Sequence, residues 1–164
     1  MSLRTDLLGL PPACWQNDLV TIRPITTEAD LIYAAFDCQL TDEQKELVNP
    51  AWFSIGRAYL SRDDHYPCLI CTRENRPIGF INFSKWLGAG DAYSWSYFID
   101  KYQQGKGYGT HAARLAINIL KAVNPKKSIK LSTEVCNMKA QKLYISLGFE
   151  QLPEMDGDDI VFGL

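Results

Sequence analysis

Hydrophobic positions along the chain repeat with two different periods, and the changes of period mark the expected elements. Alternating or aromatic and β-branched stretches predict strands at 19–24, 66–72, 77–84, 93–99 and 129–133. Apolar residues at helical spacing predict helices at 28–37, 41–48, 51–61, 110–123 and 138–147. Residues 151–164 are expected to add two strands around a turn at 155–158. Strands interleaved with helices predict an α/β (mixed α+β) fold, with helices on the faces of a mixed sheet.

The chain turns from the aromatic strand into the next helix through Gly105, Gly107 and Gly109. A helix start of this kind presents unpaired N–H groups and the positive end of the helix dipole, and glycines let an anion reach the backbone. The segment therefore predicts a phosphate site. It has neither the Lys-Ser/Thr ending of a P-loop nor the G-x-G-x-x-G spacing of a dinucleotide fold. The alternative is an ordinary turn, in which the glycines are needed only because the backbone adopts positive φ angles.

A second segment, 137–149, is an amphipathic helix with Asn137 as its N-cap and Gly148 as its stop. Ala140, Leu143, Tyr144 and Leu147 fall on one face of it. The structural alternative for Tyr144 is a half-buried core tyrosine.

The two segments resemble the signatures of the GNAT superfamily of acyl-CoA N-acyltransferases: Gln104-x-x-Gly107-x-Gly109 and Asn137-x-x-Ala140-x-x-Leu143-Tyr144-x-x-x-Gly148-Phe149. The resemblance implies a GNAT-like fold, with a mixed, mostly antiparallel sheet of six or seven strands. That sheet would be splayed between its fourth and fifth strands and flanked by about four helices. It also implies acetyl-CoA as co-substrate and no metal.

In this family an amine attacks the thioester of acetyl-CoA directly, with both substrates bound. The resemblance maps backbone N–H groups for the acyl and pantetheine carbonyls onto Phe98 and Ile99, and the general acid onto Tyr144. A phenol near its ordinary pKa is protonated at neutral pH and can donate to sulfur. The implied cofactor-binding residues are Phe98, Ile99, Gln104, Gly105, Lys106, Gly107, Tyr108, Gly109, Thr110, Asn137 and Tyr144.

The general base has no obvious candidate on the strand where many family members carry one. Residues 92–99 contain no carboxylate. Glu134 follows the next strand and is our first candidate, with Asp91 as a second. His65 is a third, although a lone histidine beside Asp63 and Asp64 is more often a surface residue. A chain of water molecules without a single base is the remaining option.

Other sequence features resemble the bacterial spermine/spermidine (diamine) N-acetyltransferases, notably the acidic segment 42–48 and the serine-containing segment 51–61. Carboxylates would attract a polycationic amine, and aromatic faces would bind it by cation–π contacts. The predicted acceptor-binding residues are Asp42, Glu43, Trp52 and Trp95. The alternative is that these acids form a solvated helix face. Two other functions stay open: acetylation of a protein N-terminus or lysine, and a non-catalytic acyl-CoA-binding module.

Length and composition set the remaining expectations. With 164 residues and 46% hydrophobic content, residues 19–164 are expected to form a single N-acetyltransferase domain after an N-terminal extension, 1–18. A formal charge of −2 gives no general attraction to nucleic acid, and no apolar run is long enough to span a membrane. The oligomeric state stays open, with a homodimer as one option.

The cysteines indicate the cellular compartment and include one further candidate for a catalytic residue. Five cysteines, an odd number, indicate reduced thiols and a cytoplasmic protein. Cys68 and Cys71 are expected on opposite faces of one strand, which disfavours a metal or redox pair. Cys136 lies near the expected acyl-CoA region, where a buried apolar role is favoured over a nucleophilic one.

Overall fold

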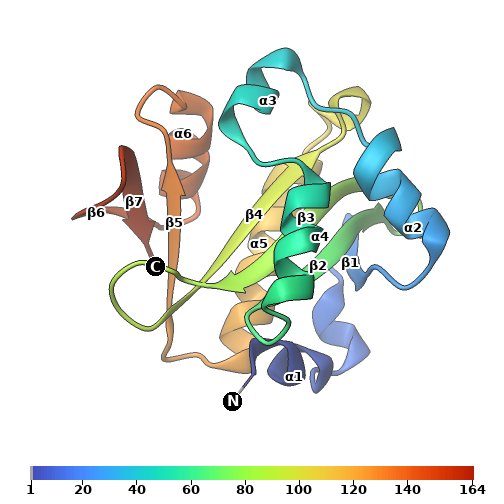
Figure 1. Cartoon of the computed structure of the whole chain (residues 1–164), viewed down its shortest axis with the longest axis horizontal. Helices are drawn as coiled ribbons and strands as arrows, with labels where there is room; N and C mark the ends of the chain where they lie inside the picture. The colour runs from blue at the N-terminus through green and yellow to red at the C-terminus, as the bar shows by residue number, and fades with distance from the viewer. Residues whose placement is uncertain (1) are drawn as a thin grey trace.

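The structure, a computed structural model, describes residues 2–164. One seven-stranded sheet runs through it in the order β1-β2-β3-β4-β5-β7-β6, as Figure 1 shows. Neighbouring strands are antiparallel except for β4 and β5, which are parallel. The strands are β1 (Val20–Pro24), β2 (His65–Thr72), β3 (Pro77–Lys85), β4 (Ala92–Ile99), β5 (Ser128–Thr133), β6 (Glu150–Asp156) and β7 (Asp159–Gly163). The predicted mixed, mostly antiparallel sheet is confirmed.

Helices cover both faces of the sheet, with α4 on one side and α5 on the other (Figure 1). The helices are α1 (Leu3–Leu8), α2 (Glu28–Ile32), α3 (Asp42–Leu47), α4 (Ala51–Leu60), α5 (Tyr108–Val123) and α6 (Met138–Ser146). The helix predicted at 28–37 is shorter than expected, because a π-helical turn, η2 (Tyr33–Asp37), follows α2. A 3-10 turn, η1 (Pro12–Trp15), precedes β1, and another, η3 (Lys101–Gln103), follows β4.

Two hydrophobic clusters hold these layers together. The larger one packs α5, through Leu115, Ala116 and Ile119, against β1 to β5. The smaller one lies beneath α4 and includes Phe80 and Phe98. Cys68 belongs to the first cluster and Cys71 to the second, so the two thiols do lie on opposite faces of β2.

The N-terminal extension contains a helix that the sequence pattern did not predict. Leu3 and Leu7 of α1 are 1% and 0% exposed and join the larger cluster. The helix is too short for its periodicity to be read from the sequence, and tertiary packing stabilises it. The extension is therefore part of the core of this fold.

The sheet opens between β4 and β5. These two strands pair only at Ala92 with Ser128 and at Tyr93 with Ile129, and then diverge, as Figure 1 shows. The predicted splay between the fourth and fifth strands is confirmed.

None of the helices among residues 2–164 is long and apolar enough to cross a membrane.

Candidate active site

The glycine-rich turn ends in the start of α5. Gly105 and Gly107 have φ of +75° and +84°, in the left-handed region that favours glycine. Gly105, Lys106 and Gly107 are exposed, and α5 begins directly afterwards at Tyr108. No side chain within residues 2–164 caps this helix start, so the N–H groups of its first turn are available to a ligand. The turn has the geometry of an anion cradle and is not sealed in the core.

Side-chain hydrogen bonds hold this turn against β4 and α3. Gln104 Nε2 donates to Ile99 O at 3.0 Å and to Gln44 Oε1 at 2.9 Å. Tyr97 Oη donates to Gly109 O at 3.1 Å. The first residue of the glycine motif therefore fixes the turn to the end of β4. Its side chain also connects the turn to α3, whose capping box includes Gln44.

The open edge of β4 presents the backbone of alternate residues. Asp100 N donates to Ile78 O on the β3 side at 2.9 Å. Because N–H directions alternate along a strand, Ile99 and Tyr97 face the opening toward β5, and Phe98 faces β3. Ile99 O agrees with this, since it accepts from Gln104 and not from β3. The sequence-based role of Phe98 as an open N–H donor is therefore corrected: Tyr97 and Ile99 supply that edge.

Tyr144 projects from α6 into the same opening. Asn137 caps the helix by accepting a hydrogen bond from Ala140 N at 3.2 Å, as predicted. The Tyr144 ring packs against Phe149 and Phe162, with centroids 5.8 Å and 5.7 Å away. Burial raises the pKa of Tyr144 to about 12, so the phenol stays protonated across the neutral range.

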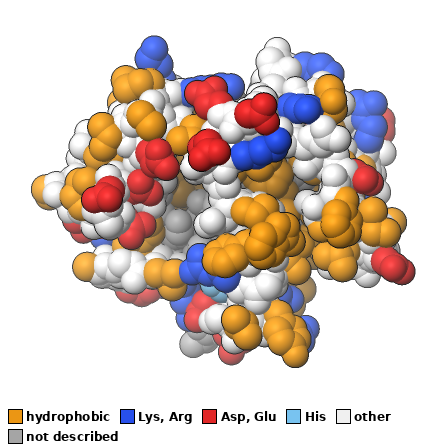
Figure 2. Space-filling view, turned by 45° about the horizontal axis from the view of Figure 1, so that its top comes forward, with side chains coloured by type: hydrophobic (Ala, Val, Ile, Leu, Met, Phe, Trp, Pro, Cys, Tyr) orange, Lys and Arg blue, Asp and Glu red, His pale blue; other side chains and the backbone are white. Residues whose placement is uncertain are grey.

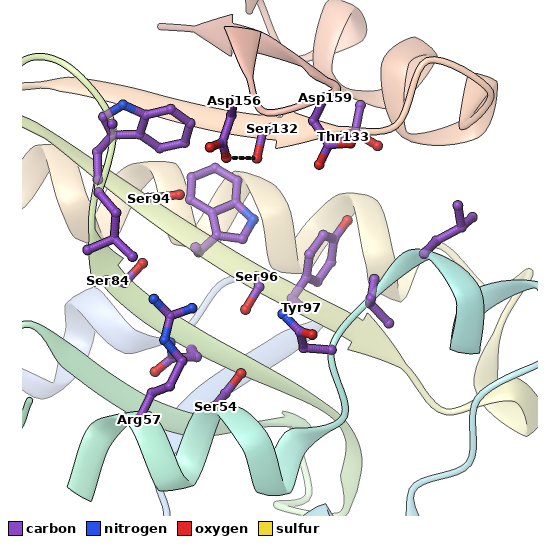
Figure 3. Close-up of a pocket in the computed structure, with 18 of the residues that line it drawn as sticks. Ser54, Arg57, Ser84, Ser94, Ser96, Tyr97, Ser132, Thr133, Asp156 and Asp159 are labelled. Atoms are coloured by element: carbon purple, nitrogen blue, oxygen red, sulfur yellow. Dashed lines mark hydrogen bonds between the residues drawn. The ribbon is translucent and has the colours of Figure 1, made fainter. Parts of the chain in front are cut away.

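β4 and α6 border a pocket of about 330 Å³, whose lining does not include the glycine-rich turn. Figure 3 shows its two walls: Ser54 and Arg57 of α4 lie across the opening from Asp156 and Asp159 of the β6–β7 hairpin. Tyr97 of β4 lies between them. Asn137, Tyr144 and Trp95 also line the pocket.

The α4 side of the sheet changes character along its strands. Toward one end it carries Leu69, Phe80 and Phe98, which belong to the apolar cluster beneath α4. Toward the other end, the same face carries Asn82 and Ser84 of β3 and Ser94 and Ser96 of β4, all of which line the pocket. Polar side chains on a covered sheet face indicate a ligand site, because packing alone would favour apolar residues there.

Four buried side-chain polar atoms have no hydrogen-bond partner within residues 2–164, and three of them line this pocket. The three are Asn82 Oδ1, Trp86 Nε1 and Trp95 Nε1. Buried polar atoms are normally satisfied. One acceptor and two donors of residues that line this pocket therefore lack a partner in the protein.

Carboxylates form the outer wall of the pocket. Asp156 and Asp159 line its β6–β7 side, and with Glu134 and Asp158 they also line a second hollow next to it; acidic side chains gather at one edge of a hollow in Figure 2. Ser132 Oγ donates to Asp156 at 2.9 Å. Burial, and then the neighbouring Glu134, Asp156 and Asp158, raise the pKa of Asp159. Like charges held together without a cation indicate that a cationic group would be favoured here.

The predicted acceptor residues are only partly brought together. Trp95 lines the pocket, whereas Trp52 is 61% exposed and lies outside its lining. Asp42 is fully exposed and paired with Lys45. Glu43 is exposed. The hydrogen bond with Glu134, and more weakly the charge of Glu43, raise the pKa of the Cys136 thiol. Asp42 and Trp52 therefore lie outside the lining of this pocket, and their role in acceptor binding stays a prediction.

The candidates for the general base lie in different parts of the structure. Glu134 lies at the acidic rim, outside the lining shared by Tyr144 and Trp95. Asp91 pairs with Lys127 and is 83% exposed. His65, expected on the surface, is buried beside Asn82. Cys136, expected to be buried, is exposed, and its raised pKa makes a nucleophilic thiolate unfavourable.

Comparison with known families agrees with this geometry. Residues 29–149 match the family described as acetyltransferase (GNAT) family. The chain belongs to the GNAT acetyltransferase family. No curated protein matches it. No cluster of side chains that could bind a metal ion occurs in the described part of this GNAT acetyltransferase.

Solved structures share the fold at low sequence identity. An acetyltransferase from Agrobacterium tumefaciens is 15% identical with a TM-score of 0.70, covering 91% of this chain and 92% of that one. The aminoglycoside acetyltransferase AAC(6')-Ib in complex with coenzyme A is 22% identical with a TM-score of 0.69, covering 88% and 94%. RimJ from Mycobacterium smegmatis, in complex with CoA-disulfide, is 18% identical with a TM-score of 0.67, covering 88% and 81%.

Sequence reasoning missed much of the acceptor side of the pocket. It did not single out Asn82, Ser84, Arg57, Asp156 or Asp159. One usable signal was present: Ser94 and Ser96 share one face of an otherwise aromatic strand, which is unusual for a covered face. The two aspartates gave no such signal, since they flank a turn, where acidic residues are common.

Proposed function

We propose that this GNAT acetyltransferase transfers the acetyl group of acetyl-CoA to a primary amine of a small molecule, with a polyamine such as spermidine or spermine as the acceptor. One observation carries the proposal. A single pocket joins the half-buried phenol of Tyr144 to the carboxylates of Asp156 and Asp159. A proton donor for sulfur and an attractive wall for a cation therefore line one reaction space.

The cofactor side of the proposal rests on the glycine-rich turn and on β4. The first-turn N–H groups of α5 would hold the pyrophosphate, and the N–H groups of Tyr97 and Ile99 would face the carbonyls of the bound thioester. Acetyl-CoA supplies the activated acyl group. Tyr144 Oη holds the proton for the departing sulfur. Donors of the β4 type each contribute about 3 kcal/mol to the barrier in other acyl-transfer enzymes.

The amine side rests on the distribution of charge across the pocket. Asp156 and Asp159 would attract a protonated amine, and Trp86 or Trp95 could contact it through the ring face. Arg57 lies on the opposite wall and would disfavour a second ammonium beside it. A polyamine satisfies both walls when one nitrogen stays protonated at the aspartates and the reacting nitrogen is neutral near α4.

The proposal is tested by thiol release from acetyl-CoA. Spermidine and spermine are compared with peptides bearing a free N-terminus, with lysine peptides and with an aminoglycoside. Turnover with the polyamines and much less with peptides supports the proposal. Preference for peptides would support protein acetylation, and coenzyme A binding without turnover for any amine would support a non-catalytic module.

Asp159→Asn separates acceptor binding from stability. Because the folded protein raises the pKa of Asp159, this carboxylate favours folding only when protonated, and its contribution is lost as pH rises through the folded pKa. At pH 7 the neutral asparagine is therefore expected to raise the thermal unfolding midpoint. It is also expected to raise KM for spermidine about threefold to tenfold, since one attractive charge is lost.

Thermal unfolding at pH 7 and initial rates against spermidine concentration measure both effects. Asp18→Asn is the matched control, because Asp18 is exposed and lies outside the pocket; both quantities should stay near the parent values. A lower KM or a lower unfolding midpoint in Asp159→Asn would contradict the acidic wall.

A further inference from the structure

Asn82 combines burial with an unused hydrogen-bonding atom. The residue is 4% exposed and lies on β3, on the face covered by α4. Its Oδ1 is buried without a partner among residues 2–164, and the residue lines the pocket. A buried amide oxygen in this state is unfavourable in the folded protein unless a ligand supplies a donor.

The neighbouring histidine determines which end of the carboxamide is left without a partner. Asn82 Nδ2 lies 3.1 Å from His65 Nδ1. Burial, and then the charge of Arg57, lower the pKa of His65, while Asp64 opposes them more weakly. The imidazole is therefore neutral at pH 7, and its Nδ1 can accept from Asn82 Nδ2. That hydrogen bond occupies Nδ2 and leaves Oδ1 as the end of the carboxamide without a partner.

Asn82 lies close to where the amine must react. It is the cross-strand partner of Ser96, and Ser96 precedes the open edge of β4 at Tyr97. Arg57 reaches from α4 toward the same part of the sheet (Figure 3). An amide oxygen accepts an N–H without holding a full charge, and the guanidinium disfavours an ammonium. The pair suits a neutral amine.

We propose that Asn82 Oδ1 accepts an N–H of the neutral attacking amine, and that His65 is a positioning residue that holds Asn82 in this orientation. The inference rests on the proposed function and deepens it. Asn82 directs the nitrogen lone pair at the acyl carbon without a carboxylate on β4. The N–C bond forms as the C–S bond breaks. Tyr144 gives its proton to sulfur. The amine nitrogen releases a proton to solvent, and Tyr144 regains one from solvent.

Asn82→Leu tests the amine contact, because leucine has a similar volume and no acceptor. We expect kcat/KM for spermidine to fall about tenfold or more, with the Kd of acetyl-CoA within about twofold of the parent value. Initial rates and calorimetric titration measure the two quantities. Asn82→Ala replaces this variant if Asn82→Leu does not fold. An unchanged kcat/KM in a folded variant overturns the proposal.

His65 is tested by a double-mutant cycle with Asn82. His65→Phe removes the acceptor for Asn82 Nδ2 and is expected to lower kcat/KM for spermidine about threefold to tenfold. In the Asn82→Leu background it should have no further effect, because it acts through Asn82. His65→Asn retains a side-chain acceptor and should stay closer to the parent. Equal effects of His65→Phe in both backgrounds overturn the positioning role.

The outcome for the parent enzyme separates this inference from the proposed function. A parent that acetylates spermidine while Asn82→Leu does so equally well leaves the function intact and removes the role of Asn82. A parent that acetylates no amine removes both.

Discussion

Tyr144→Phe is expected to lower kcat by a factor of about 10² to 10⁴, the range that general acid catalysis contributes. Phenylalanine keeps the ring that packs against Phe149 and Phe162, so the helix and the pocket wall should be retained. Only the hydroxyl proton is lost. Without it the departing thiolate must be protonated by water, which is a slower route than transfer from a positioned phenol. Steady-state rates with spermidine and calorimetric titration with acetyl-CoA measure kcat and cofactor affinity.

A tyrosine outside the pocket provides the control for this variant. Tyr59 on α4 is 86% exposed, and Tyr59→Phe should leave both kcat and cofactor affinity at parent values. If Tyr144→Phe turns over at the parent rate, the phenol is not the acid. Loss of acetyl-CoA binding together with turnover would instead indicate that Tyr144 serves in binding.

Gly109→Val is expected to weaken acetyl-CoA binding by at least about tenfold. Gly109 is the second residue of α5, where its N–H would contact the pyrophosphate. Its backbone is helical, and a Cβ would meet Ile99 Cγ1 at 3.7 Å and Tyr97 Oη at 3.9 Å, which are ordinary contacts. The fold should therefore tolerate the side chain, whereas a bound phosphate would not. Calorimetric titration with acetyl-CoA and thermal unfolding separate these two effects.

Gly56 offers the matched control, because it is also helical and a Cβ there meets no atom within 4 Å. Gly56→Val should lower stability slightly through helix propensity and leave the acetyl-CoA affinity unchanged. Gly107→Val is less informative, since φ of +84° strains any side chain. Parent-like affinity in Gly109→Val would contradict the cradle at the start of α5.

Local chemistry explains which parts of the site could be predicted. The glycine turn and the Asn137-capped helix each lie within a short stretch of chain, where spacing determines backbone geometry. The structure has the left-handed Gly105 and Gly107 and the Asn137 cap where those motifs place them. The hydrophobic pattern likewise predicted most of the strands and helices in their order along the chain. Trp95 lines the pocket, and its contact with an acceptor stays a prediction.

The acceptor side depends on contacts between distant segments. His65 reaches Asn82 across two strands. Ser54 and Arg57 come from a helix that packs above those strands, and Asp156 and Asp159 come from the last hairpin. Acidic runs such as 42–46 looked suitable in the sequence, but the orientation of α3 leaves Asp42 fully exposed. The direction of a side chain is decided by packing, not by proximity along the chain.

The sequence by itself determined the layers of the fold, the family and the glycine turn that starts α5, because glycine φ values, helix caps and hydrophobic periods act within a few residues. Only the tertiary structure decided which backbone amides face the opening of the sheet, that Phe98 is not among them, and which carboxylates reach the pocket. The physical reason is that strand register, the divergence of β4 from β5 and the packing of α4 are collective properties of the whole chain. Small differences in them turn a side chain from solvent into a pocket.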